Sequence, residues 1–198
     1  MGTIDNNIAM PELPAEIAAL ISAIDGVDRD AAKLVDGLDE AAGTWQPAPG
    51  VWSVAHCLDH LAVGNRVYLA AMAEPAARAR AAGRLRRRPA RPGFIGAMFV
   101  NFLEPPVRLK TPNPKNSTPR PSPPLADAYA AFRRSNDDLR AFIRANADLD
   151  LASIRFPNPF VRGVRFSLAT GIHVLPAHER RHVWQAWRVR EARARPLQ

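Results

Sequence analysis

The sequence has little cysteine and lacks long apolar runs. Cys57 is the single cysteine in 198 residues, so no internal disulfide can form and a reducing compartment is indicated. No stretch approaches the roughly 18 consecutive apolar residues of a membrane-spanning helix. The first ten residues contain neither the basic segment nor the apolar run of a secretory signal. We therefore expect a cytoplasmic protein with no membrane partner.

Acidic residues are also in deficit. The chain has 27 lysines and arginines against 19 acidic residues, giving a net charge of +8. Seven arginines lie in 78–91, and a second group lies in 188–195. A phosphate-binding patch would explain such clusters, but no helix-turn-helix, zinc-finger spacing or aromatic-basic interleaving accompanies them. We interpret the arginines as solvated surface residues and expect no nucleic-acid partner.

The apolar pattern predicts an all-α protein. Residues 11–190 suit one domain, because 47% hydrophobic and 23% charged residues is an ordinary globular composition. Apolar residues recur at helical spacing in 11–38, in a segment after Ser53 that ends near 82–83, in a segment beginning near Leu125, and in a segment after Ser167 that ends near 190. Ser53 and Ser167 suit the N-cap position. Residues 39–52 and 148–166 are predicted to be irregular connections.

The connection between the second and third helices is unusually long. It spans 84–124 and contains a short apolar piece, 94–103, that could form a helical turn or two. Eight prolines follow between Pro105 and Pro124, a density that resists both helix and sheet. We predict that this arginine-rich and proline-rich insertion is a mobile cover, outside the core.

Two histidines stand four residues apart in the last predicted helix. His178 and His182 therefore project from one face, one turn apart, as two nitrogen ligands of a divalent metal do. They continue the apolar stripe that begins at Leu168, so they are expected to face inward, where an imidazole needs a partner. Pro176 is expected to kink this helix.

A third histidine, His60, lies in the second predicted helix. Two packed helices could then supply three histidine ligands and leave further coordination positions open, as in catalytic rather than structural sites. His56, one turn before His60, is a candidate fourth ligand, and a plain polar role is the alternative. His173 is expected to point elsewhere, and Cys57 to be a small buried residue.

Two short motifs resemble those of the DinB-like superfamily, which includes the YfiT-like metal-dependent proteins and the thiol-dependent S-transferases. Residues 52–54 read WSV and residues 60–62 read HLA, similar to the start of that family's second helix. Residues 178–185 read HERRHVWQ, similar to the motif of its last helix. The resemblance implies a four-helix bundle of up-down-down-up topology, here with the proline-rich insertion between helices two and three. It also implies that His60, His178 and His182 bind a divalent metal such as zinc or nickel, with water completing the coordination.

A metal held by three histidines has two chemical uses. It can bind and deprotonate a low-molecular-weight thiol for attack on an electrophilic substrate, or it can turn water into hydroxide for hydrolysis. Because the family resembled contains thiol S-transferases, we expect a transferase acting on a small molecule, with a homodimer left open. A hydrolase and a non-enzymatic metal-binding or stress-related protein are the alternatives. Glu179, Asp59 and Gln185 lie near the ligands in sequence and could orient imidazoles or transfer protons.

Overall fold

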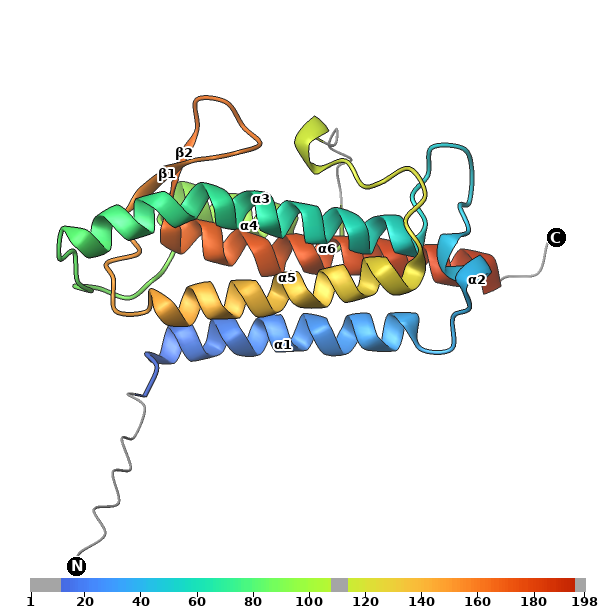
Figure 1. Ribbon diagram of the computed structural model, residues 1–198, viewed down its shortest axis with the longest axis horizontal. Coiled ribbons are helices and arrows are strands. Elements are labelled where there is room, and N and C mark those ends of the chain that lie inside the picture. Colours follow the sequence, from blue (N-terminus) through green and yellow to red (C-terminus); the bar gives the residue numbers. More distant parts are fainter. Residues whose placement is uncertain (1–11, 108–113, 195–198) are drawn as a thin grey trace, which may run out of the picture.

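The structure is a computed structural model that describes residues 12–107 and 114–194 (Figure 1). The first ten residues, position 11 of the first predicted helix, positions 108–113 of the insertion and the last arginine of the 188–195 group lie outside the described part. Within that part, the chain is mainly helical, as the sequence predicts. Among the described helices, none combines the length and apolar character needed to cross a membrane.

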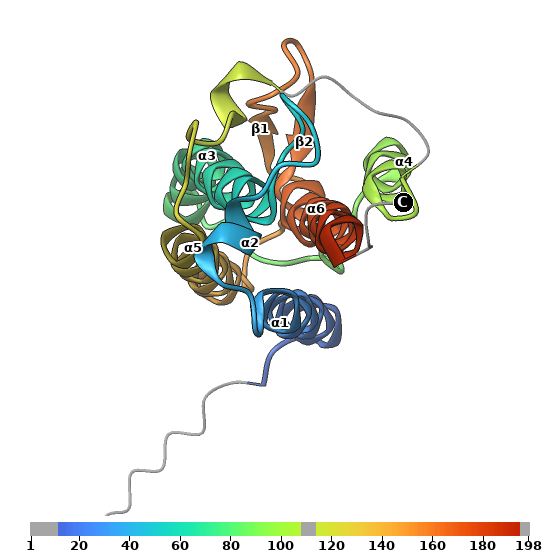
Figure 2. The same cartoon turned by 90° about the vertical axis from the view of Figure 1, so that its right-hand side faces the viewer.

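Four long helices lie side by side (Figures 1 and 2). They are α1 (Ala15–Val35), α3 (Val54–Ala81), α5 (Leu125–Ala145) and α6 (Leu168–Ala194). Helices α1 and α3 each contact both α5 and α6. The colours of Figure 1 show that α1 and α6 run in one direction, whereas α3 and α5 run in the other.

Local signals set where these helices begin. Ser53 Oγ accepts a hydrogen bond from the backbone N–H of His56 at 3.2 Å, which satisfies one of the free donors at the start of α3. Ser167 Oγ accepts from the backbone N–H of Thr170 at 3.0 Å at the start of α6. The predicted beginnings of α3, α5 and α6 are confirmed. Helix α6 continues through Pro176 as one helix, and the kink at this residue stays a prediction.

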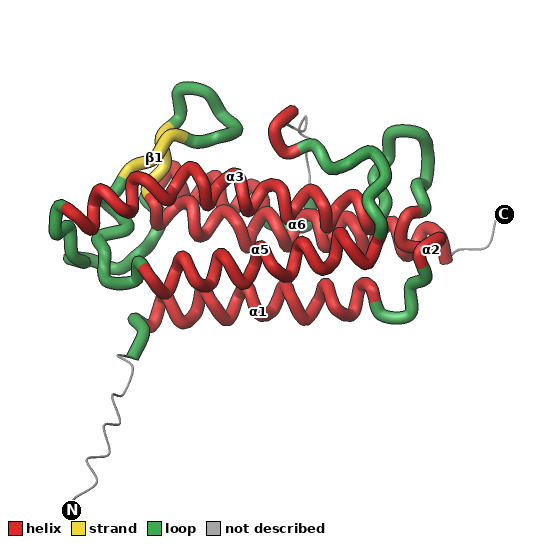
Figure 3. The backbone as a smooth tube through the Cα atoms, in the orientation of Figure 1, coloured by secondary structure: helices red, strands yellow, loops and turns green. Residues whose placement is uncertain are grey.

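The two connections predicted as irregular each contain regular structure (Figure 3). Residues 39–52 include the short helix α2 (Glu40–Thr44), capped by the Asp39 carboxylate. Residues 148–166 include strand β1 (Arg155–Pro157), which pairs antiparallel with β2 (Arg165–Ser167). Phe156 and Phe166 pair across this hairpin and are buried. Elements this short contain too few residues to show a periodic apolar pattern in the sequence. Their stability comes from packing on the long helices.

The insertion contains the helical piece predicted at 94–103 and a further short element. It contains α4 (Phe94–Leu103) and the short 3-10 helix η1 (Lys115–Ser117). Helix α4 approaches α6 closely, because a side-chain carbon placed on Gly96 would lie 2.4 Å from Thr170 Oγ1. Ala90 and Leu103 belong to the hydrophobic core. The prediction that the insertion stays outside the core is therefore wrong for these residues, and its mobility stays a prediction.

A layer of buried polar side chains divides the core into two apolar clusters. One cluster contains Met72 and Leu175, and the other contains Leu58 and Phe132. All four long helices contribute to the polar layer, which consists of Asp28, Asn65, Ser135, Asn136 and Glu179. Asn65 donates hydrogen bonds to Asn136 Oδ1 at 2.9 Å and to Glu179 Oε1 at 2.8 Å, and Asn136 donates to Asp28 Oδ1 at 2.8 Å. His178, the residue before Glu179, lies beside this layer, because a side-chain carbon placed on Gly64 of α3 would lie 3.6 Å from its ring.

Candidate metal centre

His60 is the buried member of the histidine cluster. Its side chain lies on α3 and is only 2% exposed. Its Nδ1 lies 2.5 Å from the backbone carbonyl oxygen of Ser117 in η1. Because a carbonyl can only accept, this hydrogen bond places the imidazole proton on Nδ1. The other ring nitrogen, Nε2, is then unprotonated and can act as an acceptor or as a metal ligand.

His178 and His182 stand one turn apart on α6, as their spacing predicts. Their ring centroids are 4.6 Å apart. His182 Nδ1 lies 3.0 Å from Gln185 Oε1, so the amide oxygen accepts the Nδ1 proton and Nε2 of His182 is again free to bind. This contact agrees with the expectation that Gln185 could orient a ligand imidazole.

The three imidazoles meet in one place. The centroid of His60 lies 5.0 Å from that of His178 and 4.5 Å from that of His182. One ligand atom from each of the three residues falls within 4.8 Å of the others. His60 Nε2 and His178 Nε2 are 3.2 Å apart. Two nitrogens bound to one ion at about 2.0–2.1 Å would be about 3 Å apart, so this spacing fits a shared metal.

Electrostatics favours the ligand form of these side chains. Burial lowers the pKa of His60, although the Ser117 carbonyl opposes the shift. Burial also lowers the pKa of His178 to about 3, and the neighbouring His60 and Arg181 act in the same direction. The pKa of His182 is likewise held well below its ordinary value. Neutral imidazoles are what a metal binds, so the cluster is prepared for a cation.

The three clustered histidines differ in exposure. His178 and His182 are partly exposed, whereas His60 is buried. The ring of Trp52, just before α3, lies 4.7 Å from that of His60 and 5.7 Å from that of His182. Trp52 therefore forms an aromatic wall beside the nitrogens. A site with three donors and partial exposure can also accept a ligand from solvent.

The other histidines are engaged elsewhere. His56 Nδ1 lies 2.6 Å from Ser53 Oγ and accepts from the Ser53 backbone N–H at 3.4 Å, and its Nε2 lies 3.0 Å from the Pro121 carbonyl oxygen. Both ring nitrogens are thus used by the chain, and His56 takes the plain polar role rather than that of a fourth ligand. His173 Nδ1 donates to the Ala169 carbonyl at 2.8 Å, away from the cluster.

Cys57 and two acidic residues also have defined places. Cys57 is fully buried, as expected, and burial raises the pKa of its thiol to about 12. The Asp59 carboxylate accepts from the Arg120 backbone N–H at 2.8 Å and from Arg120 Nε at 2.9 Å. Glu179 points into the polar layer, where burial raises its pKa to about 8. Neither carboxylate hydrogen-bonds a histidine of the cluster.

The insertion forms part of the site's surroundings, in agreement with its predicted role as a cover, although the sequence did not indicate which of its residues contact α3. Ser117, Arg120 and Pro121 all contact residues in the first two turns of α3. Two of these contacts use backbone carbonyl oxygens, which every residue possesses, so residue type carries no signal for them. The prolines are the one sequence feature that could have indicated these contacts, since they favour an extended chain that can run along a helix.

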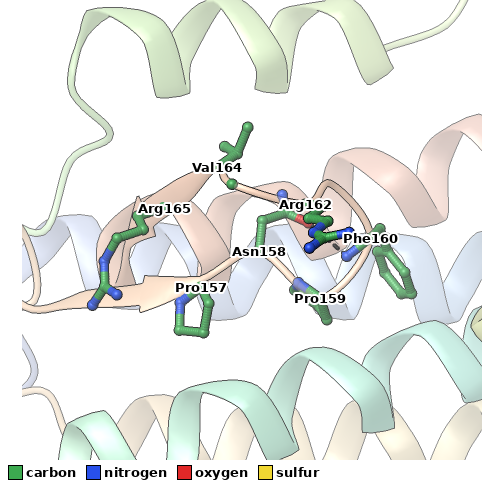
Figure 4. Close-up of a pocket in the computed structure, with 8 residues that line it drawn as sticks. Pro157, Asn158, Pro159, Phe160, Arg162, Val164 and Arg165 are labelled. Atoms are coloured by element: carbon green, nitrogen blue, oxygen red, sulfur yellow. Dashed lines mark hydrogen bonds between the residues drawn. The ribbon is translucent and has the colours of Figure 1, made fainter.

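A pocket of about 550 Å³ lies elsewhere, at the β1–β2 hairpin. Figure 4 shows Phe160 and Arg162 at one end of it and Arg165 at the other. None of the three clustered histidines lines this pocket. Asn158, which also lines it, donates to Tyr68 Oη at 3.3 Å on α3. The histidine cluster, rather than this pocket, is the place with metal-binding chemistry.

The fold and the cluster define a mainly helical protein with a site that could hold a metal ion. The sequence profile of the DinB superfamily matches residues 23–186. This range contains all three histidines and most of every long helix, and the chain belongs to the DinB superfamily. Neither a curated protein nor a solved structure matched the chain.

Proposed function

We propose that the protein is a divalent-metal-dependent transferase in which His60, His178 and His182 hold the ion. Its substrates would be a low-molecular-weight thiol and a small electrophilic molecule. The opposed directions of the two helix pairs support the up-down-down-up bundle implied by the family motifs, with the insertion joining α3 to α5. The observation that carries the proposal is the convergence of three neutral imidazoles, with two Nε2 atoms 3.2 Å apart.

The surrounding residues set up the donors before any ion binds. The Ser117 carbonyl and the Gln185 amide oxygen hold the Nδ1 protons of His60 and His182, so that both Nε2 lone pairs point to the cluster. The network from Asn65 to Glu179 holds α6 against α3 directly beside His178. The ligands therefore lose little freedom on binding, which favours affinity.

The ion would supply charge at an open position, where it lowers the pKa of a small thiol and makes it a nucleophile at neutral pH. Zinc and nickel both suit imidazole donors. In the transfer, a sulfur–carbon bond forms while the bond from that carbon to its leaving group breaks, and the thiol proton passes to solvent. The chain's own contribution is to orient the donors and, through Trp52, to limit the space beside them.

Metal content tests the ligand assignment. Each of His60→Ala, His178→Ala and His182→Ala is expected to lose most of its bound zinc or nickel, measured by elemental analysis of purified protein. His173→Ala is the matched control, because His173 lies on α6 but bonds to Ala169 instead of facing the cluster. If the triple alanine variant retains a full equivalent of metal, the assignment is wrong.

Titration of the cobalt-substituted protein tests the chemistry. Low-molecular-weight thiols are expected to produce a sulfur-to-metal charge-transfer band, and the histidine variants are expected to lack it. Turnover with an electrophile should then require both the thiol and the metal. Hydrolysis of an ester or amide without any thiol response would assign the site to a hydrolase. Stoichiometric metal with neither thiol response nor turnover would assign it a non-enzymatic role.

A further inference from the structure

Helix α4 has an apolar outer face. Its inner face packs on α6 at Gly96, and Leu103 on the same side belongs to the hydrophobic core. Figure 2 shows α4 on the outside of the molecule beside α6. The side chains pointing away from the core are also large and apolar: Phe94 is 81% exposed, Ile95 74%, Met98 58% and Phe102 43%. At about 100° per residue, these four fall within one arc of roughly 100°.

This face is unusual in two respects. Helix α4 contains no charged residue, and its sequence is FIGAMFVNFL. The four side chains together expose on the order of 500 Å² of apolar surface, as much as the largest patch on a typical monomer. Most exposed helices place charged residues on their outer face. Because this face has none, we infer that it contacts an apolar partner.

The chain just before α4 is strongly basic. Arg87 and Arg91 are exposed and make no ion pair with any residue in the described part of the chain. Their neighbour Arg88 reaches Asp150 only at 3.4 Å, with its own side chain 58% exposed. Arg91 stands three residues before Phe94, so at least this exposed cation lies close to the start of the apolar face. An apolar helix face bordered by arginines is the pattern of a helix that lies in an anionic membrane interface.

A second copy of the chain fits this surface less well. Two copies would bring together chains that each carry a net charge of +8. An anionic lipid surface does not meet this obstacle, because it is apolar below the headgroups and negative at them.

We propose that the protein associates peripherally with anionic lipid bilayers, with the outer face of α4 inserted at the headgroup level and Arg87 and Arg91 on the phosphates. This proposal differs from the expectation, drawn from the lack of long apolar runs, that the protein has no membrane partner. The association is independent of the proposed metal chemistry. His178→Ala is therefore expected to bind vesicles as the unmodified protein does.

Vesicle flotation tests the proposal with the full chain. The protein should float with vesicles of phosphatidylcholine and phosphatidylglycerol in equal parts, bind phosphatidylcholine alone weakly, and dissociate as salt rises. The double variant Phe94→Ser, Ile95→Asn should bind about tenfold less or worse. The double variant Arg87→Glu, Arg91→Glu should lose the preference for anionic vesicles. These side chains are exposed, so unchanged thermal unfolding midpoints are expected and should be verified.

Exposed residues of other segments offer matched controls. Val51→Ser removes an apolar side chain that is 40% exposed just before α3, and Arg134→Glu reverses an exposed arginine of α5, the helix that lies across the molecule from α4 in Figure 2. Both variants should bind like the unmodified protein. Equal binding to neutral and anionic vesicles, or no loss in the α4 variants, overturns the proposal. So does a stable dimer that ignores vesicles and becomes monomeric in the Phe94→Ser, Ile95→Asn variant, since the partner is then a second copy.

Discussion

Individual ring nitrogens decide which histidines can serve a metal. His60 and His182 each have Nδ1 occupied by an oxygen acceptor, which leaves Nε2 available. His56 has both nitrogens occupied by the chain. Residue type alone would rank the three equally. The difference lies in the hydrogen-bond partner of each ring, which sets its tautomer and direction.

Gln185 is expected to strengthen metal binding without touching the ion. Gln185→Leu removes the acceptor of the His182 Nδ1 proton, so the ring is freer to rotate and its Nε2 is a weaker donor. We expect metal affinity to fall about 10- to 100-fold, measured by competition with a chromophoric chelator. Gln185→Glu keeps an oxygen acceptor and should retain most of the affinity. Equal affinities in both variants would contradict this role.

Cys57 is expected to be inert in the folded protein. Burial raises its pKa to about 12, so the thiol stays protonated at neutral pH, and its side chain has no exposed surface. Since only the thiolate reacts, alkylation near neutral pH should be more than about a hundredfold slower than in the urea-unfolded chain. Mass spectrometry of iodoacetamide-treated protein measures both rates. Rapid stoichiometric labelling of the native protein would show that the thiol is accessible.

At the scale of elements, the start of α3 serves stability while its second turn serves the site. Ser53 and His56 form a reciprocal cap in which each side chain bonds the other's backbone N–H. His60, one turn later, faces the cluster. The insertion passes over both turns, with Pro121 against His56 and Ser117 against His60. One segment thus contacts the cap and a candidate ligand together.

His56→Ala separates these two roles. The variant loses part of the cap and the contact to Pro121, so we expect the free energy of unfolding to fall by about 1–2 kcal/mol. Metal content should remain near that of the unmodified protein, because His56 does not face the cluster. Urea unfolding and elemental analysis on the same preparation measure the two effects. Loss of metal with unchanged stability would restore His56 as a fourth ligand.

At the scale of the molecule, the buried polar layer aligns the long helices. Asp28 of α1, Asn65 of α3, Asn136 of α5 and Glu179 of α6 are joined by hydrogen bonds. Sliding one helix by a turn would leave these groups buried without partners, at a cost of about 1–3 kcal/mol each. The layer therefore favours the register in which His60 meets His178.

Arg140 is expected to be the strongest single contributor to this layer's stability. It pairs with the nearly buried Asp28 and, at 2.8 Å, with Asp25, so Arg140→Met would leave the Asp28 carboxylate unpaired. We expect a loss of about 3 kcal/mol in urea unfolding. The control Arg78→Met removes an ion pair to Glu74 in which both side chains are about two-thirds exposed, and should change stability by less than about 0.5 kcal/mol.

A double variant supplies the decisive comparison for Arg140. Asp28→Asn removes the carboxylate that Arg140→Met would strand, so the two changes together should cost less than the sum of the single losses. Strict additivity would mean that the two side chains act independently. In that case the polar layer would not stabilise the bundle as a unit.

The sequence by itself determined the long helices and the residue types of the site. Helix boundaries at Ser53, Leu125 and Ser167 could be predicted, since caps and apolar periodicity act over a few residues. The spacing of His178 and His182 sets their shared face in the same local way. The family's motifs added His60, which no local rule connects to the last helix.

Only the tertiary structure decided how distant segments meet. The 3.2 Å approach of His60 to His178 depends on the packing of α3 against α6. The Ser117 carbonyl enters the site through a backbone group that carries no sequence signal. The position of α4 was also decided by the tertiary structure, because its apolar sequence is equally compatible with a buried core helix. Its outer face is exposed because Gly96 and Leu103 lie on the side of α4 that meets the rest of the protein, whereas Phe94, Ile95 and Met98 lie on the opposite side.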